Sequence, residues 1–288
     1  MTTTDEELQA AADYFGLASS WADTAPGERT HYHDLGSGTP MLFVHGSGAG
    51  VSAAANWWLN LPAIAEHHRT IAVDLIGFGR TVDAPDTEYG IKAWVAHLCR
   101  LLDALGLERT WLVGNSLGGW IALQMAIDHP ERVLGVISMG TGGAKRKTGA
   151  LSSHAAPQVT PEGIRKVLED FVVDSTLVSD ELVNARYALA RSAGAEDRFR
   201  RVVAAREVDR EALPLDDDAL AALACPVLLT HGREDSVIPV ERSWRLANLI
   251  PDVELHVYSR CGHWSQVEQA APFNDLLVDF VRRHPVDA

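Results

Sequence analysis

The sequence predicts an α/β fold with a mostly parallel central sheet that carries helices on both faces. Short apolar runs alternate with longer helical patterns, and most of these runs are continuously apolar. The alternation stops once, between about residues 140 and 215, where the chain becomes helical, charged and irregular. Alternating strands and helices build parallel sheets through right-handed crossovers, and a sheet covered on both faces needs strands that are apolar on both sides.

The individual elements follow from the same patterns. Apolar runs predict strands at residues 41–44, 70–73, 111–113, 133–138, 227–230 and 253–258, and helical periodicity predicts helices at 91–105 and 118–128. Thr160 before Pro161, and Ser179 before Asp180, are typical of helix starts in the interrupted region. We expect a core of residues 1–140 and 216–288, with residues 141–215 forming a helical lid. The first segment of the chain, before any strand signal, would be a loose arm or a docked helix.

The size and charge of the chain limit its possible partners. The chain has 288 residues, of which 47% are hydrophobic, and a formal net charge of −14. It can therefore fold as one large α/β domain or as two ordinary domains, and its acidic surface argues against nucleic acid and anionic membranes as partners. Residues 1–10 lack the pattern of a signal peptide, and no apolar run approaches the ~20 residues of a membrane span. We expect a cytoplasmic protein.

The cysteines give no sign of a metal site. Cys99, Cys225 and Cys261 are scattered, and no C-x-x-C pair is present. Paired thiolates of a zinc site are therefore not indicated, and reduced thiols are the expected state. No nucleotide-binding glycine motif is present either. The sequence predicts a protein without metal or cofactor.

A nucleophile motif follows the strand at 111–113. The segment Gly114-Asn115-Ser116-Leu117-Gly118 is a G-x-S-x-G motif that leads directly into a helical pattern. In this setting the serine lies on a sharp strand-to-helix turn, where its hydroxyl is exposed for nucleophilic attack. A free serine is a weak nucleophile and needs a base. We therefore expect Ser116 to be the nucleophile of a catalytic triad.

The partners of this serine are expected downstream. His263 follows the last strand, in Arg-Cys-Gly-His-Trp, and Asp235 follows the strand at 227–230, in His-Gly-Arg-Glu-Asp. The chain order serine, aspartate, histidine is the order of the α/β-hydrolase fold, whose lid would be inserted after the sixth strand. We predict His263 as the base and Asp235 as the orienting acid, with Glu234 as the alternative acid.

The oxyanion of such a reaction needs two backbone donors. One donor is expected from the amide of Leu117, directly after the nucleophile. The other is expected from the glycine-rich loop after the strand at 41–44, with Ser47 as the donor residue. Gly46 and Gly48 in this loop would let the backbone approach a bound substrate closely.

These motifs together resemble the meta-cleavage product hydrolases, which hydrolyse carbon–carbon bonds in aromatic degradation. The resemblance covers roughly residues 30–284. It rests on the loop at 45–57, on Gly-Asn-Ser-Leu-Gly-Gly at 114–119, on His-Gly-Arg-Glu-Asp at 231–235 and on Arg-Cys-Gly-His-Trp at 260–264. The chain departs from the family at Ala49, where proline is usual, and the lid shows little of the family's sequence.

The resemblance implies a substrate and a further set of residues. The family cleaves 2-hydroxy-6-oxohexa-2,4-dienoates to 2-hydroxypenta-2,4-dienoate and a carboxylic acid, and it suggests a homodimer or higher homo-oligomer. Arg186 lies where the family places its substrate arginine, and Arg191 is the alternative position. Asn56 and Asn115 resemble the polar partners of the substrate's 2-oxygen and carboxylate. Trp264 is expected either to wall the pocket or simply to pack.

Two other functions use the same triad or fold. One is a carboxylesterase or lactonase, and the other is a small-molecule binding protein with vestigial chemistry. The filled triad positions argue against the binding protein. Arg186 together with Asn56 favours the carbon–carbon hydrolase over the esterase, because an ordinary ester carries no carboxylate for an arginine to hold.

Overall fold

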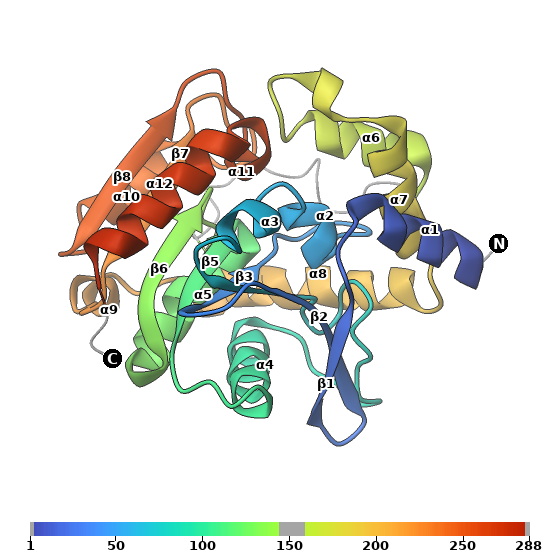
Figure 1. Cartoon of the computed structure of the whole chain (residues 1–288), viewed down its shortest axis with the longest axis horizontal. Helices are drawn as coiled ribbons and strands as arrows, with labels where there is room; N and C mark the ends of the chain where they lie inside the picture. The colour runs from blue at the N-terminus through green and yellow to red at the C-terminus, as the bar shows by residue number, and fades with distance from the viewer. Residues whose placement is uncertain (1–2, 144–158, 286–288) are drawn as a thin grey trace.

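The computed structural model describes residues 3–143 and 159–285, so the part of the predicted lid at 144–158 lies outside the described residues. The described chain forms an eight-stranded sheet with the strand order β1-β2-β4-β3-β5-β6-β7-β8 (Figure 1). The strands are β1 (Ser20–Ala25), β2 (Glu28–Leu35), β3 (Pro40–Val44), β4 (Arg69–Val73), β5 (Thr110–Asn115), β6 (Val133–Met139), β7 (Val227–Gly232) and β8 (Val253–Tyr258). Strands β3 to β8 pair in parallel, whereas β1 and β2 form an antiparallel edge.

Helices cover both faces of the sheet, as the apolar strands predicted. Alternate residues of a strand pack into different cores: Met41 and Phe43 of β3 join one core, and Leu42 and Val44 join the other. The first core contains α1 (Asp5–Phe15), α2 (Ala53–Trp57), α3 (Leu61–Ile64), α11 (Ser265–Glu268) and α12 (Ala270–Arg283), together with two helices of the insertion described below. The second core contains α4 (Ile91–Ala104), α5 (Leu117–Asp128) and α10 (Glu241–Ala247), and a short 3₁₀ turn covers Pro130–Arg132.

The insertion between β6 and β7 is helical in its described part. It contains α6 (Pro161–Glu169), a 3₁₀ turn (Ser175–Leu177), α7 (Asp180–Ala190), α8 (Ala195–Ala212) and α9 (Asp217–Ala221). Both predicted helix starts are confirmed, since the Thr160 hydroxyl accepts from the Gly163 amide and the Ser179 hydroxyl accepts from the Leu182 amide. Figure 1 shows α6 and α7 next to each other, close to the N-terminal helix α1.

The first segment of the chain is a docked helix. Helix α1 has a capping box formed by Thr4 and Glu7, and it lies against α7 of the lid (Figure 1). The Thr3 hydroxyl donates to the Ala188 carbonyl at 2.8 Å, and Tyr14 Oη lies 3.3 Å from Ser179 Oγ. The N-terminal segment therefore holds the outer face of α7.

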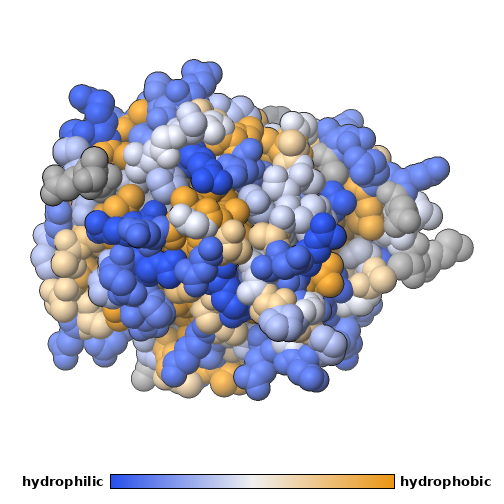
Figure 2. Space-filling view, turned by 60° about the horizontal axis from the view of Figure 1, so that its bottom comes forward, coloured by the Kyte–Doolittle hydropathy of each residue, from blue (hydrophilic) through white to orange (hydrophobic). Residues whose placement is uncertain are grey.

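The surface of the described residues carries both hydrophobic and hydrophilic side chains. Exposed large hydrophobic side chains include Val208 and Trp244. On the face in Figure 2, hydrophobic residues form small areas between hydrophilic ones, as is ordinary for a protein surface. Among the helices in residues 3–143 and 159–285, none has the length and hydrophobicity needed to cross a membrane.

Candidate active site

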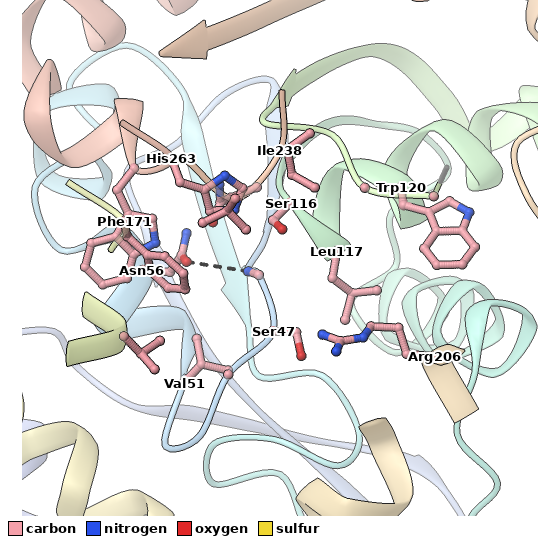
Figure 3. Close-up of a pocket in the computed structure, with 18 of the residues that line it drawn as sticks. Ser47, Val51, Asn56, Ser116, Leu117, Trp120, Phe171, Arg206, Ile238 and His263 are labelled. Carbon is pink, nitrogen blue, oxygen red and sulfur yellow. Dashed lines mark hydrogen bonds between the residues drawn. The ribbon is translucent and has the colours of Figure 1, made fainter. Parts of the chain in front are cut away.

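Ser116 lies in a sharp turn between β5 and α5. Its backbone has φ 54° and ψ −106°. Residues other than glycine rarely adopt a positive φ. Two glycines make the turn possible: a Cβ on Gly114 would lie 2.3 Å from the Gly118 carbonyl oxygen, and one on Gly118 would lie 2.0 Å from the Val44 carbonyl oxygen. The turn therefore presses against the end of β3, and the Ser116 side chain faces a cavity beneath the lid (Figure 3).

His263 reaches the same cavity from the loop after β8. Its Nδ1 lies 2.8 Å from Asp235 Oδ2, and both side chains are almost completely buried. Gly140, at the end of β6, is packed against this pair, because a Cβ there would lie 2.9 Å from His263 Nδ1. Among the described residues, Ser116 Oγ makes no hydrogen bond to His263. In hydrolases this contact often tightens only when substrate is bound.

A second histidine contacts the buried aspartate. His231 Nε2 lies 3.1 Å from Asp235 Oδ2, and the Val237 and Ile238 amides donate to Oδ1 at 2.8 and 2.9 Å. Burial alone would raise the pKa of Asp235. The charge of His263 and these hydrogen bonds outweigh burial and hold the pKa well below its usual range. Asp235 is therefore an anion that can orient His263 and stabilise its charged form.

His45 holds the glycine loop after β3 in place through hydrogen bonds of both its ring nitrogens. Burial lowers the pKa of His45 and keeps its ring neutral. His45 Nδ1 lies 2.7 Å from the Gly46 carbonyl, and its Nε2 accepts from the Leu75 amide at 3.1 Å. A Cβ on Gly46 would lie 3.5 Å from the Ser116 Cβ, so the loop runs directly beside the nucleophile. Ser47 and Leu117 both line the cavity there (Figure 3).

The side-chain amides of two buried asparagines, Asn56 and Asn115, lie next to this loop. The Gly46 amide donates to Asn56 Oδ1 at 3.5 Å, and a Cβ on Gly46 would lie 2.9 Å from Asn115 Oδ1. Both side chains line the cavity, and neither Asn56 Nδ2 nor Asn115 Nδ2 has a hydrogen-bond partner within the described chain. The Ser47 hydroxyl is buried without a partner as well. A buried donor without a partner is costly, so these groups are suited to a polar ligand.

Arg186 enters the cavity from α7 of the lid. Only 1% of the residue is exposed, and burial lowers its pKa to about 10, so it stays charged at neutral pH. Its Nη2 donates to the Ala49 carbonyl at 2.9 Å, while Nε and Nη1 have no partner in the described structure. The guanidinium carbon lies 5.7 Å from the centre of the Trp264 ring, which also lines the cavity. This is a buried cation with two donors left for an anion.

The predicted residues are thus brought together around one cavity. It is lined by Gly46, Ser47, Gly48, Asn56, Asn115, Ser116, Leu117, Arg186, His263 and Trp264, and Asp235 lies behind His263. The two alternative residues lie elsewhere. Glu234 accepts from the Cys261 amide at 3.0 Å and from Arg233, and the guanidinium of Arg191 lies over the Tyr187 ring.

The residues that connect the lid to the His263 loop were not predicted from the sequence. Phe171 packs its ring 5.4 Å from those of both His263 and Trp264, and its carbonyl accepts from the Trp264 amide. Glu268 accepts from the Gly262 amide at 2.5 Å and from the Val173 amide at 2.7 Å. No motif in the sequence marks these contacts, because they join segments about ninety residues apart.

Three charged residues of α8 were not predicted either. Arg206, Glu207 and Arg210 line the cavity. Together with Phe199 and Val202 they lie at helical spacing along α8, and Val202 is fully buried. The signal was present, because a stripe of this period marks the inner face of a helix, but two arginines within the stripe hid it.

The fold and this arrangement of serine, histidine and aspartate define an alpha/beta hydrolase, and a family model described as alpha/beta hydrolase fold matches residues 39–270. The chain is 42% identical to a 2-hydroxy-6-oxo-2,4-heptadienoate hydrolase of Pseudomonas putida, over 89% of this chain and 94% of that protein. It is 41% identical to a 2-hydroxymuconate semialdehyde hydrolase of a Pseudomonas species, over 89% and 92%.

A solved structure gives the same result. A variant of the meta-cleavage product hydrolase of Pseudomonas fluorescens superposes with a TM-score of 0.88 at 37% identity, and the match covers 93% of this chain and 99% of that one. The chain belongs to the meta-cleavage product hydrolases of the alpha/beta hydrolase fold family. The resemblance inferred from the sequence motifs is confirmed at the level of the family.

Proposed function

We propose that the protein hydrolyses the carbon–carbon bond of a 2-hydroxy-6-oxohexa-2,4-dienoate. The observation that carries this proposal is the pair of unpartnered donors on buried Arg186, in the same cavity as Ser116. A planar guanidinium with two donors matches a carboxylate, and an ordinary ester offers none. The names of the relatives at 41% and 42% identity support the same substrate class.

The residues take the following roles in this proposal. Arg186 holds the substrate carboxylate, and the free amide groups of Asn56 and Asn115 hold the carboxylate and the 2-oxygen. His263, oriented by Asp235, helps to move the proton that converts the dienol to its keto form. Gly46 and Gly48 allow the loop backbone to approach the bound substrate.

The bond then breaks by hydrolysis. Ser116 supplies the nucleophile to the C6 carbonyl, through its own oxygen or through a water that it activates. The amides of Ser47 and Leu117 stabilise the oxyanion that forms, with the Ser47 hydroxyl assisting. The C5–C6 bond breaks because the dienoate fragment leaves as a delocalised dienolate, which takes up a proton. Water is added overall, and the products are 2-hydroxypenta-2,4-dienoate and a carboxylic acid.

Mixing the purified protein with a yellow meta-cleavage dienoate tests this proposal. Catalytic loss of the visible absorbance is expected, with Ser116→Ala as the blank that separates enzymatic from spontaneous decay. Hydrolysis of activated esters without any turnover of dienoates would instead support the esterase. A cytoplasmic location and a homodimer or higher homo-oligomer stay predictions, to be checked by fractionation and by light scattering.

A further inference from the structure

One end of the cavity carries a charge cluster that the proposed reaction does not use. Arg206 and Arg210 are one turn apart on α8, and both side chains are only 17% exposed. Glu207 lies between them, 3.6 Å from Arg206 and 3.0 Å from Arg210. Arg206 Nε is buried and has no hydrogen-bond partner in the described part of the chain. The cluster therefore has two cations for one carboxylate.

This cluster comes from α8, whereas Arg186 enters the same cavity from α7. Arg186 contacts Ala49 and Trp264, next to the glycine loop. In Figure 3, the Arg206 side chain lies below Leu117 and Trp120 with its guanidinium next to Ser47, whereas Asn56 lies below His263, toward Phe171. Arg210 also lines an adjoining cavity. The cavity is thus lined by a second cationic group besides Arg186.

Gly142, Gly143 and Ile238 lie in the same part of the cavity as Arg210. They line both cavities together with Arg210, and the Gly142 amide donates to the Ser116 carbonyl at 3.0 Å. With the substrate carboxylate at Arg186 and C6 at Ser116, a C6 substituent that passes Gly142 would reach this part of the cavity. The residues of α8 are therefore placed to contact that substituent.

Two arginines are a poor lining for a hydrocarbon substituent. Burial and the neighbouring charge of Arg210 lower the pKa of Arg206, and Glu207 opposes this only in part. Covering such a cation with an alkyl or aryl group would remove the remaining water without providing a partner. An anionic group on the substrate would satisfy the free Nε instead.

We propose that Arg206 and Arg210 form an anion subsite for a second carboxylate, carried by the substituent on C6. This inference rests on the proposed function and specifies its substrate as a dioate. Water then adds across the C5–C6 bond as before: hydroxyl joins the C6 acyl carbon, and a proton joins the dienoate fragment. The acyl product is a dicarboxylic acid.

The test compares two matched substrates. One carries a 2-carboxyethyl group on C6, and the other carries the nearly isosteric 2-carbamoylethyl group, which has the same size but no charge. We expect the wild-type kcat/KM to be at least tenfold higher for the acid, mainly through a lower KM. A third substrate with methyl on C6 reports whether dienoates are cleaved at all.

Variants of α8 then attribute the preference to its residues. Arg206→Met should lower the acid-to-amide ratio at least fivefold, the double change with Arg210→Met should bring it close to one, and Arg206→Lys should retain part of it. Arg200→Met is the matched control, because Arg200 lies on the same helix, is 72% exposed and pairs with Asp197. This control should leave the ratio unchanged, and melting curves should show that each variant is folded.

The outcomes separate the two proposals. If no dienoate is cleaved, the proposed function is wrong. If all three dienoates are cleaved but the acid has no advantage over the amide, the function stands and the anion subsite is wrong. An acid preference that survives the double variant would also overturn the subsite, because the second carboxylate would then be held elsewhere.

Discussion

Replacing Arg186 by leucine removes the guanidinium that is proposed to hold the substrate carboxylate, but keeps a large side chain at this position. The guanidinium makes one recorded hydrogen bond in the described structure, to the Ala49 carbonyl, and its other two donor atoms face the cavity unpaired. Exchanging a buried cation without a counter-charge for an apolar side chain is often neutral or stabilising. We therefore expect a melting temperature no lower than that of the wild type.

The kinetic loss follows from the two free donors of Arg186. A hydrogen bond to a charged group contributes about 1.5–3 kcal/mol, and a bidentate, water-excluded pair lies at the upper end of this range or above it. At about 1.4 kcal/mol per factor of ten, kcat/KM for a dienoate should fall at least tenfold and up to a few hundredfold. A small activated acetate ester has no carboxylate, so its hydrolysis should fall by much less.

Both rates should be measured on the same folded preparation of Arg186→Leu, by loss of dienoate colour and by release of the ester's chromophore. Arg191→Leu is the comparison, since Arg191 ends the same helix and its guanidinium lies over the Tyr187 ring, 4.9 Å from the ring centre. An equal loss on both substrates would show that Arg186 only supports the structure. A dienoate defect in Arg191→Leu alone would move the clamp there.

Three further predictions concern the triad, the pH dependence of stability and metals. Ser116→Ala should lower turnover by several orders of magnitude, and Asp235→Asn should also be severe, whereas Glu234→Gln should be mild; the reverse order for the two acids would refute the assignment of Asp235. Burial lowers the pKa of His97 to about 4 in the folded protein. In the unfolded chain a histidine has a pKa of about 6.5, so as the pH falls the unfolded chain binds a proton at this histidine before the folded protein does. The free energy of unfolding should thus drop by roughly 1.6 kcal/mol between pH 6.5 and 5 from this group, and urea titrations should show a shallower drop for His97→Gln. Activity should survive exhaustive chelation, and recovery only on adding a divalent metal would contradict the predicted absence of a cofactor.

The strands and the nucleophile turn could be predicted because their signals are local. A fully buried parallel strand is a run of apolar residues, and the turn at Ser116 needs glycines at fixed spacing. The prediction of 253–258 matches β8, and the other predicted strands are one or more residues shorter than β3 to β7. Strand β1 was missed because it is an edge strand, whose residues are all partly or fully exposed, so it has no apolar run.

The lid could be predicted only in part. Its helix starts at Thr160 and Ser179 depend on local capping and were found. Which lid side chains enter the cavity depends on how α7 and α8 pack on the core, and this is not a local property. Arg186 was found by family resemblance, whereas Arg206 was not found. A search for charged residues at the inward-facing spacing of α8 would have detected it.

The division between core and lid also separates chemistry from specificity. The reacting side chains lie at the ends of β5, β7 and β8, where contacts such as that of Gly118 with Val44 fix them. The arginines that line the cavity, Arg186 and the pair Arg206 and Arg210, lie on α7 and α8. Glu268 connects the two parts, because its carboxylate binds backbone amides of both the His263 loop and the lid. If the proposed anion subsite is correct, substitutions on the inner face of α8 should change which C6 substituent is accepted, whereas changes at Glu268 should affect every substrate through the position of His263.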